Sequence, residues 1–142
     1  MIELVFVIVV LGILAAVAIP KFAASRTDAQ IAKGRADVSS VRSGIITERQ
    51  SRLITGDATF IKGSELNSGG LFGGILTYPI TDSTEAGHWH STGTDSDAQA
   101  TYNYNVAGTD VGFTYTRSNG TFSCSKTSGT DAAKDYCAKL ID

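Results

Sequence analysis

The sequence opens with MIELVFVIVVLGILAAVAIP, residues 1–20, an apolar run that holds a single carboxylate at Glu3. The apolar and small residues between Glu3 and Pro20 are just numerous enough to cross a bilayer as a helix. A secretory signal peptide begins with Lys or Arg and ends at a small-residue cleavage site, and this run has neither. A charge within the apolar head of an ordinary membrane anchor costs roughly 2.5–3.5 kcal/mol. We therefore expect Glu3 to serve a function whose partner lies elsewhere.

Two parts of this run, Ile2-Glu3-Leu4 and Gly12-Ile13-Leu14-Ala15-Ala16-Val17-Ala18-Ile19-Pro20, resemble the N-terminal signature of the type IV pilins. The resemblance covers residues 1–20 and is highly specific. It implies that Glu3 pairs with the N-terminal amine of a neighbouring subunit during filament assembly. It also implies that the backbone between Gly12 and Pro20 can unwind in the filament. Because the family's mature chain usually carries Phe-Thr before the residue matching Met1, we expect two further residues and a basic leader peptide ahead of Met1.

The resemblance implies a structural subunit that polymerises with copies of itself into a bacterial surface filament. Its expected partners are the inner membrane before assembly, the pilus assembly machinery and a prepilin peptidase. A pseudopilin of a type II secretion system shares the signature and is the first alternative. A monomeric, membrane-anchored binding domain is the second, and Glu3 argues against it because an anchor has no use for a buried acid. Adhesion, motility, DNA uptake and conduction all stay open as the task of the filament.

Composition limits the chain to one small domain plus the apolar segment, because it has 142 residues of which 42% are hydrophobic. The formal net charge of −2 provides no overall basic field, so no nucleic-acid partner is predicted. Cys124 and Cys137 are a close pair that predicts one disulfide in an exported domain. That disulfide also favours the pilin, since the resemblance implies that the major pseudopilin carries a calcium site and usually lacks one.

A helical pattern continues from Lys21 to about Thr55, with a kink expected at Pro20 and a plausible stop at Gly56. The helix would span roughly 75–80 Å at 1.5 Å per residue, so half of it must project from so small a domain. Gly34 and Gly44 weaken it by about 1 kcal/mol each relative to Ala, so tertiary packing must hold it. The apolar residues on one face of its second half form an amphipathic stripe: Ile31, Val38, Val41, Ile45 and Leu53.

Three arginines recur every seven residues beside this stripe, at Arg35, Arg42 and Arg49. One interpretation is that their stems cover apolar surface while the guanidinium groups stay solvated. The other is that they form an intersubunit charge row with acids of adjacent subunits, such as Asp28, Asp37 or Glu48. Glu48 and Arg52 also have the favourable order for an i,i+4 pair within the helix.

Residues 56–99 predict a connecting loop, with a possible short strand at 75–78. His88 and His90 lie among acids there, which suggests a metal site, but two histidines in a polar loop are more often surface residues. Asp95 and Asp97 lack the glycine and final glutamate of an EF-hand loop. We predict no metal and no cofactor. Since no nucleophile stands beside a base anywhere in the sequence, we also predict no enzymatic activity.

Alternation with a period of two begins at Ala100 and predicts three antiparallel strands within 100–124. Residues 107–110 predict one turn, and Asn119-Gly120 predicts a type I′ hairpin turn. A bond between Cys124 and Cys137 would fold the C-terminal region, 125–142, back over the sheet. The predicted fold is therefore α+β: a hydrophobic helical segment over 1–20, its amphipathic continuation over 21–55 packed on the sheet, the loop, the sheet and a disulfide-closed end. This layout resembles that of the pilins, although the residues beyond Pro20 match nothing specific.

Overall fold

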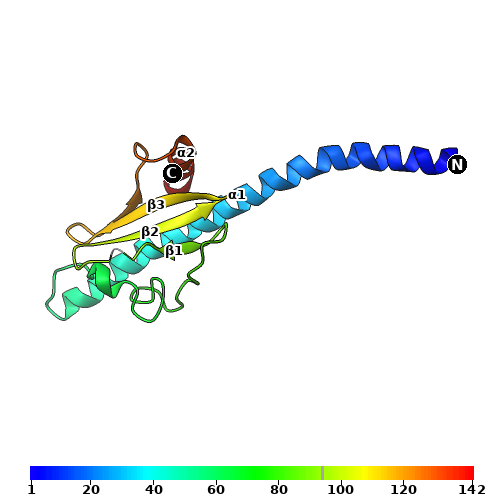
Figure 1. Ribbon diagram of the computed structural model, residues 1–142. Helices are drawn as coiled ribbons and strands as arrows, with labels where there is room; N and C mark the ends of the chain where they lie inside the picture. The colour runs from blue at the N-terminus through cyan, green and yellow to red at the C-terminus, as the bar shows by residue number, and fades with distance from the viewer. Residues whose placement is uncertain (94) are drawn as a thin grey trace.

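The computed structural model describes residues 1–93 and 95–142, with the side chains of Pro20 and Ala23 outside the description. One long helix carries a four-stranded sheet and a short second helix on its C-terminal half, while its N-terminal half projects from this domain (Figure 1). In chain order the elements are α1 (Ile2–Ile54), the 3₁₀ helix η1 (Gly63–Glu65), β1 (Trp89–Ser91), β2 (Gln99–Val106), β3 (Thr109–Thr116), β4 (Thr121–Cys124) and α2 (Asp131–Ile141).

The long helix ends where the sequence predicts. α1 has 53 residues, its cap is Thr55, and Gly56 follows with a φ of +91°. That left-handed conformation suits a glycine and commonly ends helices. Over residues 1–26 the described side chains are exposed apart from the half-buried Ala18. The domain therefore packs only against the later part of the helix.

The amphipathic stripe of α1 is confirmed over most of its length. Val38, Val41 and Ile45 are buried, and Ile31 packs at the edge of the core. The prediction is wrong at Leu53, whose side chain is 49% exposed. Arg52 lies seven residues after Ile45 and so continues the buried face by two helical turns. Its guanidinium binds Glu65 at 2.9 Å, so the last turn of the interface is ionic where the sequence predicted an apolar contact.

The sheet is antiparallel with the order β1-β2-β3-β4, and one face of it covers α1. β2 and β3 pair along their whole length, for example Tyr102 with Phe113 and Tyr104 with Val111. The predicted alternation is confirmed, since the apolar residues of β2, β3 and β4 are buried at every second position: Ala100, Tyr102, Tyr104, Val106, Val111, Phe113, Tyr115 and Phe122. The domain is a two-layer α+β structure with its core between helix and sheet.

Both hairpin turns differ from their predictions. Val106 pairs with Thr109, so the first turn contains only Ala107 and Gly108, at φ +51° and +86°. Two positive φ values match a type I′ turn, so this geometry lies one hairpin earlier than predicted. The second hairpin has a four-residue loop, because Thr116 pairs with Thr121, and within it Gly120 N donates to Thr116 O at 2.9 Å. Gly120 alone in that loop has a positive φ, so the predicted type I′ turn there is wrong.

Two strand assignments within residues 56–99 were also wrong. Residues 75–78 form no strand, because the amides of Ile75 and Leu76 donate instead to the carbonyl of Phe72. The edge strand β1 lies at Trp89–Ser91, where the sequence predicted a loop. It pairs with β2 and places Trp89, which is fully buried, opposite Tyr104. A strand of three residues between polar neighbours is too short to show a period of two.

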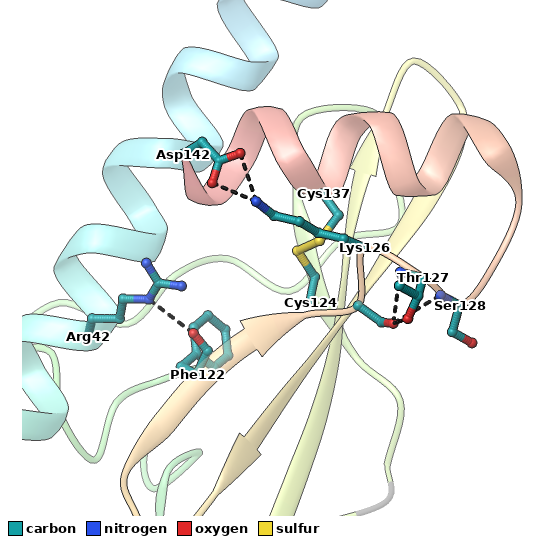
Figure 2. Close-up of a disulfide and its surroundings, with 9 residues drawn as sticks. Arg42, Phe122, Cys124, Lys126, Thr127, Ser128, Cys137 and Asp142 are labelled. Carbon is teal, nitrogen blue, oxygen red and sulfur yellow. Dashed lines mark hydrogen bonds and ion pairs between the residues drawn. A yellow bond between two sulfur atoms is a disulfide. The ribbon is translucent and has the colours of Figure 1, made fainter.

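The predicted disulfide is confirmed between Cys124, at the end of β4, and Cys137 on α2 (Figure 2). The sequence predicted the closure but not the helix. Thr130 caps α2 by accepting a hydrogen bond from Ala133 N at 3.2 Å. Cys137 and Leu140 are buried on the inner side of the helix, and α2 contacts α1, β3 and β4. The C-terminal region is therefore a docked element of the core.

Candidate functional site: the exposed half of the long helix

The N-terminal half of α1 is apolar on all its sides. The residues from Leu4 to Leu11 are all large and apolar, and each is at least 39% exposed. Successive side chains on an α-helix differ by about 100°, so this run covers every direction around the axis. A helix that is hydrophobic all round is normally buried in a membrane or among other protein segments. No described residue of this chain's own domain covers it.

By length and composition, α1 qualifies as a helix able to cross a membrane. The apolar stretch lies near the N-terminus, is not buried, and signal sequences share these properties. The finding is compatible with membrane association and does not distinguish an anchor from a signal.

Glu3 lies in the first turn of α1 and is exposed. Within the described residues no ion pair includes it. The first Lys or Arg after it in the sequence is Lys21, roughly 27 Å away along a straight helix. An ionised carboxylate in apolar surroundings needs a cation or takes up a proton. Within the described residues, Glu3 therefore has no Lys or Arg of its own chain as an ion-pair partner.

Gly12 lies in the middle of the apolar half, and Pro20 near its end. A Cβ atom on Gly12 would meet nothing within 4 Å, so the glycine answers no packing need inside one chain. The backbone of α1 is one helix from Ile2 to Ile54, so neither residue ends it. The side chain of Pro20 lies outside the described residues. Unwinding between the two is a prediction for an assembled state.

The arginine row ties α1 to three different parts of its own domain. Arg35 Nε donates to the carbonyl of Lys139 on α2, and Arg42 Nε donates to that of Phe122 on β4 at 3.0 Å (Figure 2). The guanidinium of Arg49 lies 4.3 Å from the centroid of the Phe60 ring. None of the three takes part in an ion pair among the described residues. Pairing of these arginines with acids of neighbouring subunits stays a prediction. It would use the terminal Nη atoms of the arginines.

Two of the acids proposed as partners for the arginine row, Glu48 and Asp37, bind other residues of the same chain. Glu48 binds Arg52 at 3.1 Å, which confirms the predicted i,i+4 pair. Asp37 Oδ2 accepts a hydrogen bond from Nε1 of Trp89 at 3.1 Å. Burial raises the pKa of Asp37, while the Trp89 hydrogen bond and the nearby Lys33 oppose that rise. Asp37 is therefore an internal link between α1 and β1.

Further hydrogen bonds that the sequence did not predict hold the sheet, and the segment before β1, on α1. Tyr104 Oη donates to the carbonyl of Gln30 at 2.6 Å, and Lys33 Nζ donates to that of Gly87 at 2.6 Å. Burial raises the pKa of Tyr104 to about 12, so its hydroxyl keeps its proton at all ordinary pH values. These pairs are more than fifty residues apart in the sequence, so no local pattern indicates them.

The histidines and acids considered for metal binding do not converge. No group of three or more His, Cys, Asp or Glu side chains suited to a metal ion exists among residues 1–93 and 95–142. His90 Nε2 lies 3.3 Å from Nδ2 of Asn103 and 3.8 Å from Oδ2 of Asp110. Asp95 accepts a hydrogen bond from Asn67, and Asp97 accepts one from Ser64. Only 14% of the His90 side chain is exposed, so it is more buried than the surface residue that the sequence suggested.

Comparison with protein-family models, with curated proteins and with solved structures found no match. The function is therefore inferred from the residues of the chain and their arrangement.

Proposed function

We propose that this protein is a structural subunit of the type IV pilin class, which polymerises through the N-terminal half of α1 into an extracellular filament. One observation carries the proposal: the apolar half of α1 is exposed on every side, whereas the domain packs only on the other half. Before assembly the apolar half would lie in the inner membrane. After assembly the apolar half would be surrounded by the apolar halves of neighbouring subunits, which exclude water from it as the membrane does.

Glu3 gives this assembly its register. A purely apolar bundle permits sliding, because every axial offset buries a similar area. A carboxylate that must meet a cation allows only certain offsets, as single polar residues do in coiled coils. The proposed cation is the N-terminal amine of an adjacent subunit, since the first basic side chain of the same chain is too distant. Processing by a prepilin peptidase and extraction by a pilus assembly machinery follow from the same proposal.

A membrane-anchored monomer would need the same apolar helix but not its acid. Because a carboxylate opposes insertion, an anchor lacking it would be more stable in the bilayer. The Cys124–Cys137 disulfide favours a pilin over a major pseudopilin, as the family resemblance implies. Which surface task the filament performs does not follow from either feature.

The test compares Glu3→Ala and Glu3→Gln with the wild-type chain in its own host. We expect both variants to fold and to insert into the membrane, because each removes a charge from an apolar environment. We expect little or no sheared surface filament from either, with the subunit retained in the membrane fraction. Lys21→Gln, which also changes one charge in the projecting half, is the matched control and should assemble. Wild-type filament yields from both Glu3 variants would refute the proposal and favour the anchored monomer.

A further inference from the structure

The last turns of α1 and the loop that follows them lie at the end of the domain remote from the N-terminus (Figure 1). An open hollow of about 550 Å³ is found there. It is formed where the last turns of α1, the loop after that helix, the start of β2 and the β3–β4 hairpin meet. Its volume falls in the range of small-molecule sites. The residues that line it are Arg49, Ala58, Thr59, Phe60, Asp97, Ala98, Gln99, Thr116, Arg117 and Ser118.

Two guanidinium groups in this lining, those of Arg49 and Arg117, are held in place by contacts with Thr59 and Phe60. Arg117 donates from Nε to the carbonyl of Phe60 at 3.0 Å and from Nη2 to Oγ1 of Thr59 at 3.2 Å. Arg49 lies over the Phe60 ring. The Phe60 ring in turn packs closely against Gly120, because a Cβ atom on Gly120 would lie 2.2 Å from Phe60 Cε1. Both arginines are therefore positioned before any ligand arrives, which lowers the entropic cost of binding.

Neither arginine is held by a direct ion pair among the described residues, although Asp57 and Asp97 attract Arg117 from a longer distance. Nε of Arg49 is shielded from solvent and has no hydrogen-bond partner in the described part of the chain. Asp97, the one acid in the lining, is engaged by Ser64 at 2.7 Å and by Lys62 at 3.3 Å. The hollow is therefore positive. Arginine binds carboxylates in a planar, two-bonded geometry, so an anion of that kind fits it best.

The rest of the lining is suited to hydroxyl groups. Thr59 Oγ1 already accepts from Arg117, so its own proton is available to a ligand. Thr116, Ser118 and Gln99 add two hydroxyls and an amide. Hydroxyls and amides both donate and accept, which matches the hydroxyl groups of a sugar. We propose that this hollow, formed by Arg49 and Arg117 with Thr59 and Ser118, is a binding site for an acidic sugar, whose carboxylate the two arginines hold.

The probe is sodium galacturonate, titrated into the full-length, ¹⁵N-labelled chain in micelles of a sugar-free zwitterionic detergent. The Nε–Hε signals of arginine report binding directly. We expect saturable shifts of the Arg49 and Arg117 signals. Galactose, which has the same ring with a neutral CH₂OH in place of the carboxylate, should cause none. Losing one charge-assisted partner should raise the Kd at least about tenfold in Arg49→Gln.

Two further variants separate binding from folding. Ala58→Trp should fill the hollow and abolish the shifts while both arginines remain, because Ala58 is an exposed part of its lining. Arg35→Gln removes an arginine of the same helical row outside the hollow and should bind as the wild type does. Absence of any saturable shift with galacturonate would overturn the proposal. Equal affinity for N-acetylglycinate, a carboxylate without a sugar ring, would also overturn it, since the site would then recognise the carboxylate alone.

Discussion

A Cβ atom on Gly34 would lie 2.5 Å from Cε1 of Tyr104, so the Tyr104 ring of β2 packs directly against the backbone of α1 at this glycine. The same atom would lie 2.6 Å from Cδ2 of Leu140 on α2. Three elements of the core therefore converge on one glycine in the middle of a helix. This is the packing that offsets the poor helix propensity of Gly34.

The first prediction is that Gly34→Ala destabilises the protein, although Ala is the better helix former by about 1 kcal/mol. The Tyr104 ring is fully buried and its hydroxyl is bonded to Gln30, so it cannot move aside. Overpacking of this kind costs about 1–3 kcal/mol, which should show as a lower urea midpoint. Gly12→Ala is the control, because nothing lies within 4 Å of its Cβ, and the midpoint of the domain should not change. A midpoint at or above the wild-type value for Gly34→Ala would contradict the packing described here.

The second prediction concerns the disulfide. Cys137→Ser should release α2 from β4 and lower stability by about 3 kcal/mol, the value expected for a loop of about fourteen residues. Residues from about Ser125 onward should become sensitive to protease while α1 stays intact. Digestion of the wild-type protein with and without reductant is the companion measurement. Equal resistance in both, with free thiols detected in each, would show that the bond does not hold this region.

The third prediction follows from the burial of Asp37, which raises the pKa of its carboxyl above the unfolded value of 3.8. Below pH 3.8 the Asp37 carboxyl is protonated in both the folded and the unfolded state, so its ionisation does not affect the free energy of unfolding. As the pH rises through the folded pKa, the folded state must ionise a shielded carboxyl, so its stability falls. Asp37→Asn keeps an acceptor for Trp89 and never ionises. Its melting temperature should therefore exceed that of the wild type at pH 7, by a margin that shrinks towards pH 3.

A second variant at this position isolates the hydrogen bond. Asp37→Leu leaves Nε1 of the buried Trp89 without its acceptor and should melt below the wild type at every pH, since an unsatisfied buried donor costs about 1–3 kcal/mol. If the margin of Asp37→Asn did not vary with pH, the carboxyl would not be the source of the effect.

The fourth prediction concerns the backbone between Gly12 and Pro20. Glycine favours the unfolded backbone and proline removes one helical hydrogen bond, so stretching this segment costs less than stretching a uniform helix. In a filament we expect it to be partly extended, and in a bilayer we expect it to be helical. A filament structure by electron cryomicroscopy decides the matter. Continuous i to i−4 bonding from Leu11 to Phe22 would refute the prediction.

Much of the fold was predictable because its signals are local and repeated. The stripe of Val38, Val41 and Ile45 specifies a helical face over several turns. The alternation through β2, β3 and β4 continues over enough residues to specify the strands and their buried face, although not the turns between them. The disulfide needed only the count and spacing of two cysteines. In the helix and the strands, a pattern several residues long excludes other conformations.

The remaining features depend on contacts between distant residues. β1 becomes a strand because β2 pairs with it and Trp89 fills the core, and nothing in its own three residues requires this. α2 carried a usable signal in its Thr130 cap, although it is short and lies among polar residues. Arg49 was visible as part of a row, but its neighbour Arg117 belongs to a different element. The hollow between them exists only once the β3–β4 hairpin meets the end of the helix.

The two outer strands of the sheet, β1 and β4, are both short, with three and four residues beside the eight of β2 and β3. One outward carbonyl on each of these strands is also occupied: Arg42 donates to that of Phe122, and Ser83 N donates to that of Trp89 at 2.9 Å. Open strand edges recruit other chains and lead to amyloid-like aggregation. Short edges of this kind disfavour joining of copies through their sheets, so in the proposed filament the crowded subunits would associate through the helix instead.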